Sequence, residues 1–115
     1  MIQTITKEEL KAKIDRGDKF RLVDVRDTHD YNEGHIVGAI HLLIAEMSRQ
    51  RAEAMFDKGE LIVTYSLDKD CPAKRIAAQR LFEYGFTHVL AYEGSWKEWR
   101  AAGYAALSGP IEVLA

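Results

Sequence analysis

The residue types best suited to chemistry are gathered in one polar segment, Tyr65-Ser-Leu-Asp-Lys-Asp-Cys-Pro72, which contains the chain's single cysteine. An apolar run precedes this segment and a helical pattern follows it, which predicts a loop joining a buried strand to a helix. Backbone N–H groups in such a loop can point inward and bind an anion beside the positive end of the helix dipole. A thiol held there would have a lowered pKa. We therefore take residues 66–71 as the candidate anion-binding loop: Ser66, Leu67, Asp68, Lys69, Asp70 and Cys71.

Four apolar runs predict the strands that position this 66–71 loop. Residues 20–25 and 61–65 are rich in branched residues, residues 88–91 form a third strong run, and a short strand is expected around 39–41. The best runs are continuously apolar, which is typical of strands covered on both faces in a parallel sheet. Sites in such sheets lie at the carboxyl ends of the strands. Three polar junctions qualify: Asp24-Val-Arg26, the 66–71 loop and Tyr92-Glu-Gly-Ser95.

Helical segments alternate with these strands. Thr6-Lys-Glu-Glu9 and Ser95-Trp-Lys-Glu98 both match a capping box, and Gly17 is expected to end the first helix. A helix opened by Pro72 is expected to end at Gly85. Helical structure is also expected over residues 27–33 and 43–56, and the tail, 107–115, is expected to pack back or to meet a partner. The predicted apolar face of the helix after Pro72 consists of Ala73, Ile76, Ala77, Leu81 and Tyr84.

The order of these motifs resembles a single-domain rhodanese over nearly the whole chain. The resemblance implies a three-layer α/β/α fold with a five-stranded, mainly parallel sheet and helices on both faces. It also implies transfer of a sulfane sulfur from thiosulfate or a persulfide to a thiophilic acceptor, with no metal and no organic cofactor. The segments that carry it are Leu22-Val-Asp-Val-Arg26, Tyr31, Gly34-His-Ile-Val-Gly-Ala-Ile40, the strand, loop and helix at 61–84, Gly85-Phe86, and Glu93-Gly-Ser-Trp-Lys-Glu-Trp99.

One residue departs from the family pattern at the point where sulfur is needed. In rhodaneses the nucleophilic cysteine takes the first position of the loop after the buried strand, and here that position holds Ser66. A serine hydroxyl is too weakly acidic to ionise near neutral pH, and a sulfane sulfur bound to oxygen is a poor intermediate. We therefore expect activity to be weak or absent. Natural divergence and an engineered replacement of cysteine both remain open as the origin of Ser66.

The remaining thiol, Cys71, resembles the second cysteine of a rhodanese subgroup whose loop ends in Asp-Cys-Pro. Its position before Pro72 predicts an N-cap, where a thiolate accepts backbone N–H bonds. Asp68 and Asp70 are expected to oppose a negative sulfur. Two interpretations stay open: a small capping residue that faces the core, or a candidate catalytic thiol.

The strand end at residues 24–26 offers two further candidates. Asp24 and Arg26 are placed to flank the mouth of the pocket, although Asp24 is also a natural hydrogen-bond acceptor for neighbouring loops and Arg26 a partner for an acid. A phosphatase of the same fold would need cysteine at the first loop position and an arginine that closes a longer loop. In Cys71-Pro-Ala-Lys-Arg75 the arginine follows the cysteine too closely.

Composition bounds the remaining possibilities. At 115 residues with 47% hydrophobic and 30% charged residues, the chain predicts one soluble domain spanning 1–115. A net charge of −2 without basic clusters indicates neither nucleic-acid nor membrane binding, and one cysteine excludes a disulfide scaffold. The histidines lack metal-site spacing, and no signal peptide is evident, so we expect a cytoplasmic protein. Expected partners are a small sulfur-containing anion or persulfide donor, with a protein partner possible, in a monomer or homodimer. The alternative function is a non-catalytic rhodanese module that binds an anion or a protein.

Overall fold

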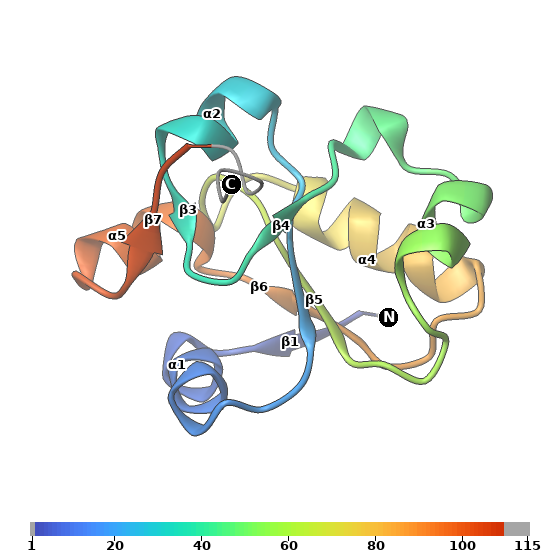
Figure 1. Ribbon diagram of the computed structural model, residues 1–115, viewed down its shortest axis with the longest axis horizontal. Coiled ribbons are helices and arrows are strands. Elements are labelled where there is room, and N and C mark those ends of the chain that lie inside the picture. The colour runs from blue at the N-terminus through green and yellow to red at the C-terminus, as the bar shows by residue number, and fades with distance from the viewer. Residues whose placement is uncertain (1, 110–115) are drawn as a thin grey trace, which may run out of the picture.

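A five-stranded sheet lies at the centre of the computed structural model, which describes residues 2–109 (Figure 1). The strand order is β1-β6-β5-β2-β4, and every pairing is parallel. The carboxyl ends of all five strands therefore meet at one edge of the sheet, as the sequence pattern predicts. The strands are β1 (Gln3–Ile5), β2 (Arg21–Asp24), β4 (Ile40–His41), β5 (Ile62–Tyr65) and β6 (Val89–Tyr92).

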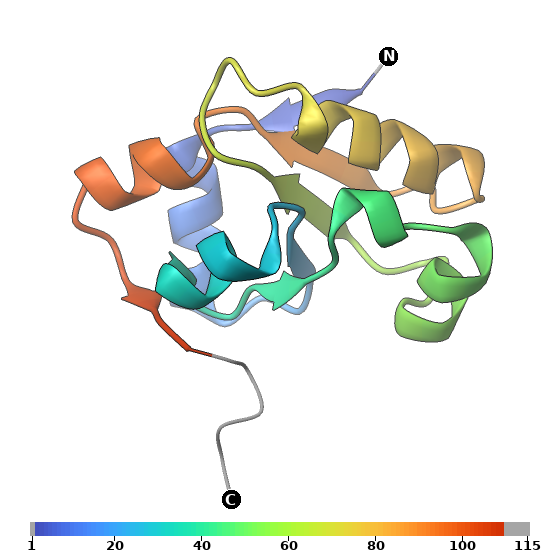
Figure 2. The same cartoon turned by 90° about the horizontal axis from the view of Figure 1, so that it is seen from above.

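Helices cover both faces of this sheet, which confirms the three-layer α/β/α fold (Figure 2). Successive residues of β5 show the two faces, because Ile62 belongs to one apolar cluster and Val63 to the other. Ala52 of α3 and Leu81 of α4 pack in the first cluster, whereas Leu10 of α1 packs in the second with Trp99 of α5. The helices are α1 (Lys7–Arg16), α2 (Thr28–Glu33), α3 (Arg49–Met55), α4 (Ala73–Glu83) and α5 (Ser95–Ala101), with a 3-10 turn, η1 (Ile44–Glu46), before α3.

The ends of α1 and α4 follow the predicted local chemistry. Thr6 accepts a hydrogen bond from the backbone N–H of Glu9 at 3.1 Å, and the Glu9 carboxylate accepts one from the N–H of Thr6 at 2.9 Å. Gly17 ends α1 with a φ of 73°. After α4, the N–H of Phe86 reaches the carbonyl oxygen of Leu81 at 3.1 Å. These bonds at the start of α1 and the end of α4 satisfy backbone groups that helix ends otherwise leave unpaired.

Two elements differ from the sequence-based expectation. The helix expected over 43–56 is divided into η1 and α3, because Ser48 adopts an extended conformation and accepts a hydrogen bond from the N–H of Arg51 at 3.1 Å. This serine cap begins a new helix that the helix-favouring composition of the segment conceals. The strand β1 is absent from the predicted runs, because a three-residue strand carries no clear pattern.

A small second sheet joins β3 (His35–Ile36) to β7 (Ala106–Leu107) in antiparallel pairing. Leu107, the first residue of the predicted tail, thus packs back on His35, while residues 110–115 lie outside the described residues. Within residues 2–109, no helix has both the length and the apolar character needed to cross a membrane.

Candidate functional site

The carboxyl edge of the sheet brings the start of the 66–71 loop against the start of α5. The backbone N–H of Ser66 donates to the Ser95 hydroxyl oxygen at 3.1 Å. In return, the N–H of Trp96 donates to the Ser66 carbonyl oxygen at 3.1 Å and that of Lys97 to the Leu67 carbonyl oxygen at 2.9 Å. The first N–H groups of α5 therefore hold the loop itself rather than an external anion.

Ser95 does not begin the capping box that its sequence context predicts. Its φ is 60°, in the left-handed region, and α5 has Gly94 at its N-cap with no side-chain capping bond. The Ser95 hydroxyl turns back to donate to the Tyr92 carbonyl oxygen at 2.9 Å, and Glu98 accepts from the Tyr92 hydroxyl at 2.8 Å. The predicted cap is wrong because both of its side chains bind the end of β6.

Ser66, the first residue of the 66–71 loop, is completely buried, with 0% of its surface exposed. Its hydroxyl faces two acceptors of Cys71, the carbonyl oxygen at 3.3 Å and the sulfur, and its single proton serves one of them at a time. In this arrangement the Ser66 side chain is not exposed to solvent.

Cys71 carries a free, partly exposed thiol at the other end of the loop. Burial acts to raise the pKa of this thiol, but hydrogen bonds from the Ala73 backbone, the Ser66 side chain and the Leu67 backbone outweigh it. The positive charge of Lys74 acts in the same direction, so the pKa of Cys71 lies below its ordinary value. The helix α4 begins at Ala73, one residue later than the sequence predicts, with Pro72 rather than Cys71 as its N-cap.

The Asp68 carboxylate accepts hydrogen bonds from two of the backbone N–H groups in the loop. These are the N–H of Asp70, at 3.1 Å, and that of Cys71, at 3.0 Å. Lys97 lies 3.8 Å from the other carboxylate oxygen of Asp68. The loop thus directs backbone donors at two acceptors that the chain supplies itself, the Asp68 carboxylate and the Cys71 sulfur.

Lys74 is a site residue that the sequence-based argument missed. Its side chain is buried, with the residue only 1% exposed, and its ammonium donates to the carbonyl oxygens of Asp68, Lys69 and Cys71 at 2.9, 3.3 and 2.7 Å. The inward face of α4 consists of Lys74, Ala77, Ala78 and Leu81, spaced i, i+3, i+4 and i+7. That spacing was a usable signal for Lys74.

The inclusion of Ile76 in the buried face of α4 is wrong. Its residue is 43% exposed, because the inward stripe is rotated by part of a turn from the predicted one. The polarity of lysine makes the true stripe difficult to recognise, since an unpaired lysine is almost never buried.

Asp24 and Arg26 form a buried ion pair beneath the site. The Arg26 guanidinium donates to both Asp24 carboxylate oxygens, at 3.0 and 2.7 Å, and to the Gly34 carbonyl oxygen at 2.6 Å. It also lies over the Trp96 ring, 5.1 Å from the ring centroid. Of this pair, only Arg26 reaches the surface of the neighbouring groove, because Asp24 is fully buried behind it.

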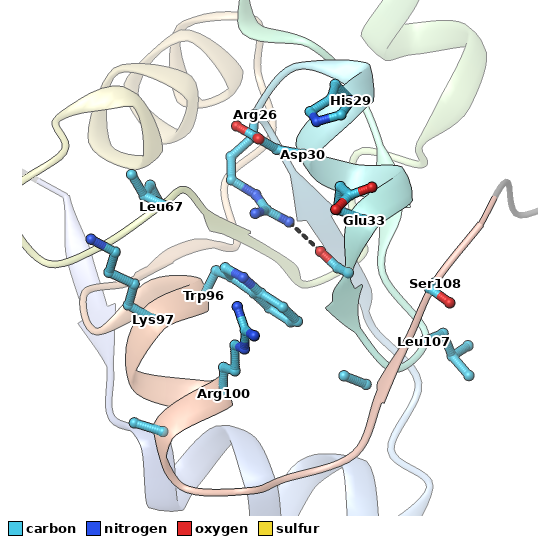
Figure 3. A pocket seen from close by; sticks show the side chains of 13 residues that line it. Arg26, His29, Asp30, Glu33, Leu67, Trp96, Lys97, Arg100, Leu107 and Ser108 are labelled. Atoms are coloured by element: carbon cyan, nitrogen blue, oxygen red, sulfur yellow. Dashed lines mark hydrogen bonds between the residues drawn. The ribbon is translucent and has the colours of Figure 1, made fainter.

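That groove, of about 870 Å³, lies between α2, α5 and β7 and reaches the 66–71 loop at Leu67 (Figure 3). Its walls differ in charge, with acidic side chains on α2 and basic ones on α5. Ser66 and Cys71 do not line it, so it adjoins the thiol's loop without containing the thiol. No cluster of three metal-ligating His, Cys, Asp or Glu residues occurs in residues 2–109. The charged lining residues are Asp30 and Glu33 from α2, Lys97 and Arg100 from α5, and Arg26 before α2; His29 of α2 also lines the groove.

Sequence comparison links this geometry to known proteins. The Rhodanese-like domain family model matches residues 6–102. Among curated relatives, the thiosulfate sulfurtransferase GlpE of Coxiella burnetii is 32% identical over 80 residues, which cover 70% of this chain and 71% of that protein.

Solved structures agree with that match. The BH2092 protein of Bacillus halodurans superposes with a TM-score of 0.87 and 25% identity, covering 92% of this chain and 77% of the other. The rhodanese-like domain of the Alr3790 protein of Anabaena sp. has a TM-score of 0.82 and 30% identity, covering 100% of this chain and 85% of the other. With most of its length matched by the family model, this chain belongs to the rhodanese-like domain family.

Proposed function

We propose that this chain is a slow rhodanese-type sulfurtransferase domain in which Cys71 carries the sulfane sulfur. The observation that supports this most directly is the contrast within one loop. Cys71 is partly exposed and has a lowered pKa, whereas Ser66 is fully buried. A thiolate is the reactive form of cysteine, so ionisation of Cys71 favours attack on sulfur.

The proposed reaction has two balanced steps. The Cys71 thiolate attacks the outer sulfur of thiosulfate, a new S–S bond forms, and the S–S bond of thiosulfate breaks so that sulfite leaves with the electron pair. A thiophilic anion such as cyanide then takes the outer sulfur from the Cys71 persulfide and restores the thiolate. Neither step requires a metal or an organic cofactor.

The geometry also gives a reason for slow turnover. A persulfide anion is stabilised by backbone N–H donors that are fixed in place before the reaction. In this loop, the N–H groups of Asp70 and Cys71 already bind the Asp68 carboxylate, and that of Ser66 binds Ser95. Fewer donors are therefore left for the sulfur that Cys71 would carry.

Loading the protein with thiosulfate and measuring its intact mass tests the proposal. We expect the mass to increase by one sulfur atom on Cys71, and cyanide to remove it as thiocyanate. Cys71→Ala should load no sulfur. Ser66→Ala keeps the only thiol and should still load sulfur, more slowly because it loses one of the bonds that lower the pKa of Cys71. Sulfur on the Cys71→Ala variant, or none on the unaltered protein, would contradict the proposal.

A second candidate function, anion binding without turnover, is favoured by the Asp68 contacts. Removing the Asp68 carboxylate frees the N–H of Asp70 and one of the two bonds of the Cys71 N–H, which keeps its bond to the Asp68 carbonyl oxygen at 3.2 Å. Asp68→Ala should therefore bind sulfate or thiosulfate several-fold more tightly. Asp70→Ala is the control, since it removes a charge from the same loop without freeing those donors. Calorimetric titration measures both affinities, and equal affinities in the two variants would argue against a latent anion site.

A further inference from the structure

We propose that the Lys74 ammonium is a positioning cation, which draws the 66–71 loop inward by three of its carbonyl oxygens and so favours the thiolate form of Cys71. This inference rests on the proposed role of Cys71. It concerns the ionisation of the thiol and the shape of the loop, which can be measured whether or not sulfur is transferred.

The burial of Lys74 requires a specific compensation. An ammonium group taken out of water is costly unless its charge and its three donors are satisfied. Within residues 2–109, no carboxylate lies at ion-pair distance from Lys74, and its three donors are instead matched by three carbonyl oxygens of the loop. The loop carbonyl oxygens therefore satisfy the Lys74 donors, and the ammonium in turn satisfies these carbonyl oxygens.

The lysine is also anchored from its backbone. The Thr64 hydroxyl donates to the carbonyl oxygen of Lys74 at 2.7 Å, and Thr64 is a fully buried residue of β5. The start of α4 is thus fixed to the strand that precedes the loop, and the ammonium then fixes the loop to α4. One residue connects strand, loop and helix.

Among the charged side chains around Cys71, Lys74 is the buried cation. From the loop itself come Asp68, Lys69 and Asp70, and from α5 comes Lys97, which is exposed and lies 3.8 Å from Asp68. Lys74 from α4 is shielded from water and bonds directly to the Cys71 carbonyl oxygen. A shielded charge interacts more strongly with its neighbours than an exposed one, because water and salt screen it less.

The rate of Cys71 alkylation by iodoacetamide as a function of pH provides the test, because this thiol is the only one in the chain. Lys74→Gln removes the charge and keeps two N–H donors for the loop carbonyls, and Lys74→Met removes both. We expect both variants to shift the inflection of the profile upward by about one pH unit, with roughly tenfold slower alkylation at neutral pH. Lys19→Met, which removes an exposed positive charge outside the 66–71 loop, should keep the original profile.

Unchanged profiles in both Lys74 variants would overturn the proposal, as would an equal shift in Lys19→Met. Should the Lys74 variants fail to fold, the unaltered protein labelled with nitrogen-15 decides the question. We expect one lysine ammonium signal to exchange slowly with water and to move when Cys71 is alkylated. If every lysine ammonium exchanges rapidly, the carbonyl-bound cation does not exist in solution and the proposal fails.

Discussion

At the scale of single residues, position within the loop decides which group can react. Ser66 follows β5 directly, and its backbone and hydroxyl are used to join the loop to Ser95 and to Cys71. Cys71 lies at the opening of α4, where backbone donors approach its sulfur. The expected repulsion from Asp68 and Asp70 does not dominate, because the pKa of Cys71 is lowered overall.

Ser95 provides a residue-scale prediction about stability. Ser95→Ala removes the acceptor for the buried N–H of Ser66 and should lower the free energy of unfolding by about 1–3 kcal/mol. Ser95→Gly loses the same bond, but glycine adopts a φ of 60° without strain, so its loss should be smaller. Urea denaturation of both variants measures the difference. A glycine variant less stable than the alanine variant would show that backbone strain at Ser95 is negligible.

At the scale of elements, the sequence predicts the helices and strands whose capping and patterning residues act on their own neighbours in the chain. The first helix is predictable because Thr6, Glu9 and Gly17 act on neighbouring backbone groups. Lys74 and Ser95 are harder to interpret because their partners come from other parts of the fold: Lys74 is buried by loop carbonyls, and Ser95 is turned toward β5 and β6. The meeting of the strand ends at one edge of the sheet was therefore predictable, whereas the bonds that shape the loop between them were not.

The packing of α2 against α5 carries an element-scale prediction. A Cβ at Gly34 would lie 2.8 Å from the Trp96 ring, so Gly34→Ala should force the two elements apart and destabilise the protein by about 1–3 kcal/mol. Gly59→Ala is the matched control, because a Cβ there meets no atom within 4 Å. Thermal unfolding compares the two. We also expect Trp96→Leu to relieve the effect of Gly34→Ala, and an unrelieved loss would place the strain elsewhere.

At the scale of the whole molecule, one face of the sheet holds phenol groups whose charged form the fold opposes. Burial raises the pKa of Tyr65 well above its ordinary value, with the negative charge of Asp24 adding to the effect. Burial likewise raises the pKa of Tyr92, and its hydrogen bond to Glu98 and the charge of Glu98 raise it further. Both tyrosines lie in the cluster that joins the sheet to α1 and α5, so their ionisation is linked to the folding of that layer.

This linkage predicts how stability falls in alkali. A raised pKa in the folded state favours the neutral phenol, so the contribution is fully present below the unfolded pKa, about 10, and is lost as pH rises above it. Tyr92→Phe should be less stable than the unaltered protein at neutral pH, because it loses the bond to Glu98. Above pH 10 the free energy of unfolding of Tyr92→Phe should fall less steeply with pH than that of the unaltered protein. The two slopes should differ by about 1.4 kcal/mol per pH unit, since one fewer phenol releases its proton on unfolding. Tyr84→Phe controls for removing a phenol outside this cluster, and denaturation curves between pH 8 and about 11 measure the slopes. Parallel slopes for Tyr92→Phe and the unaltered protein would show that Tyr92 ionises in the folded state, and that the layer between the sheet and α5 admits its charge.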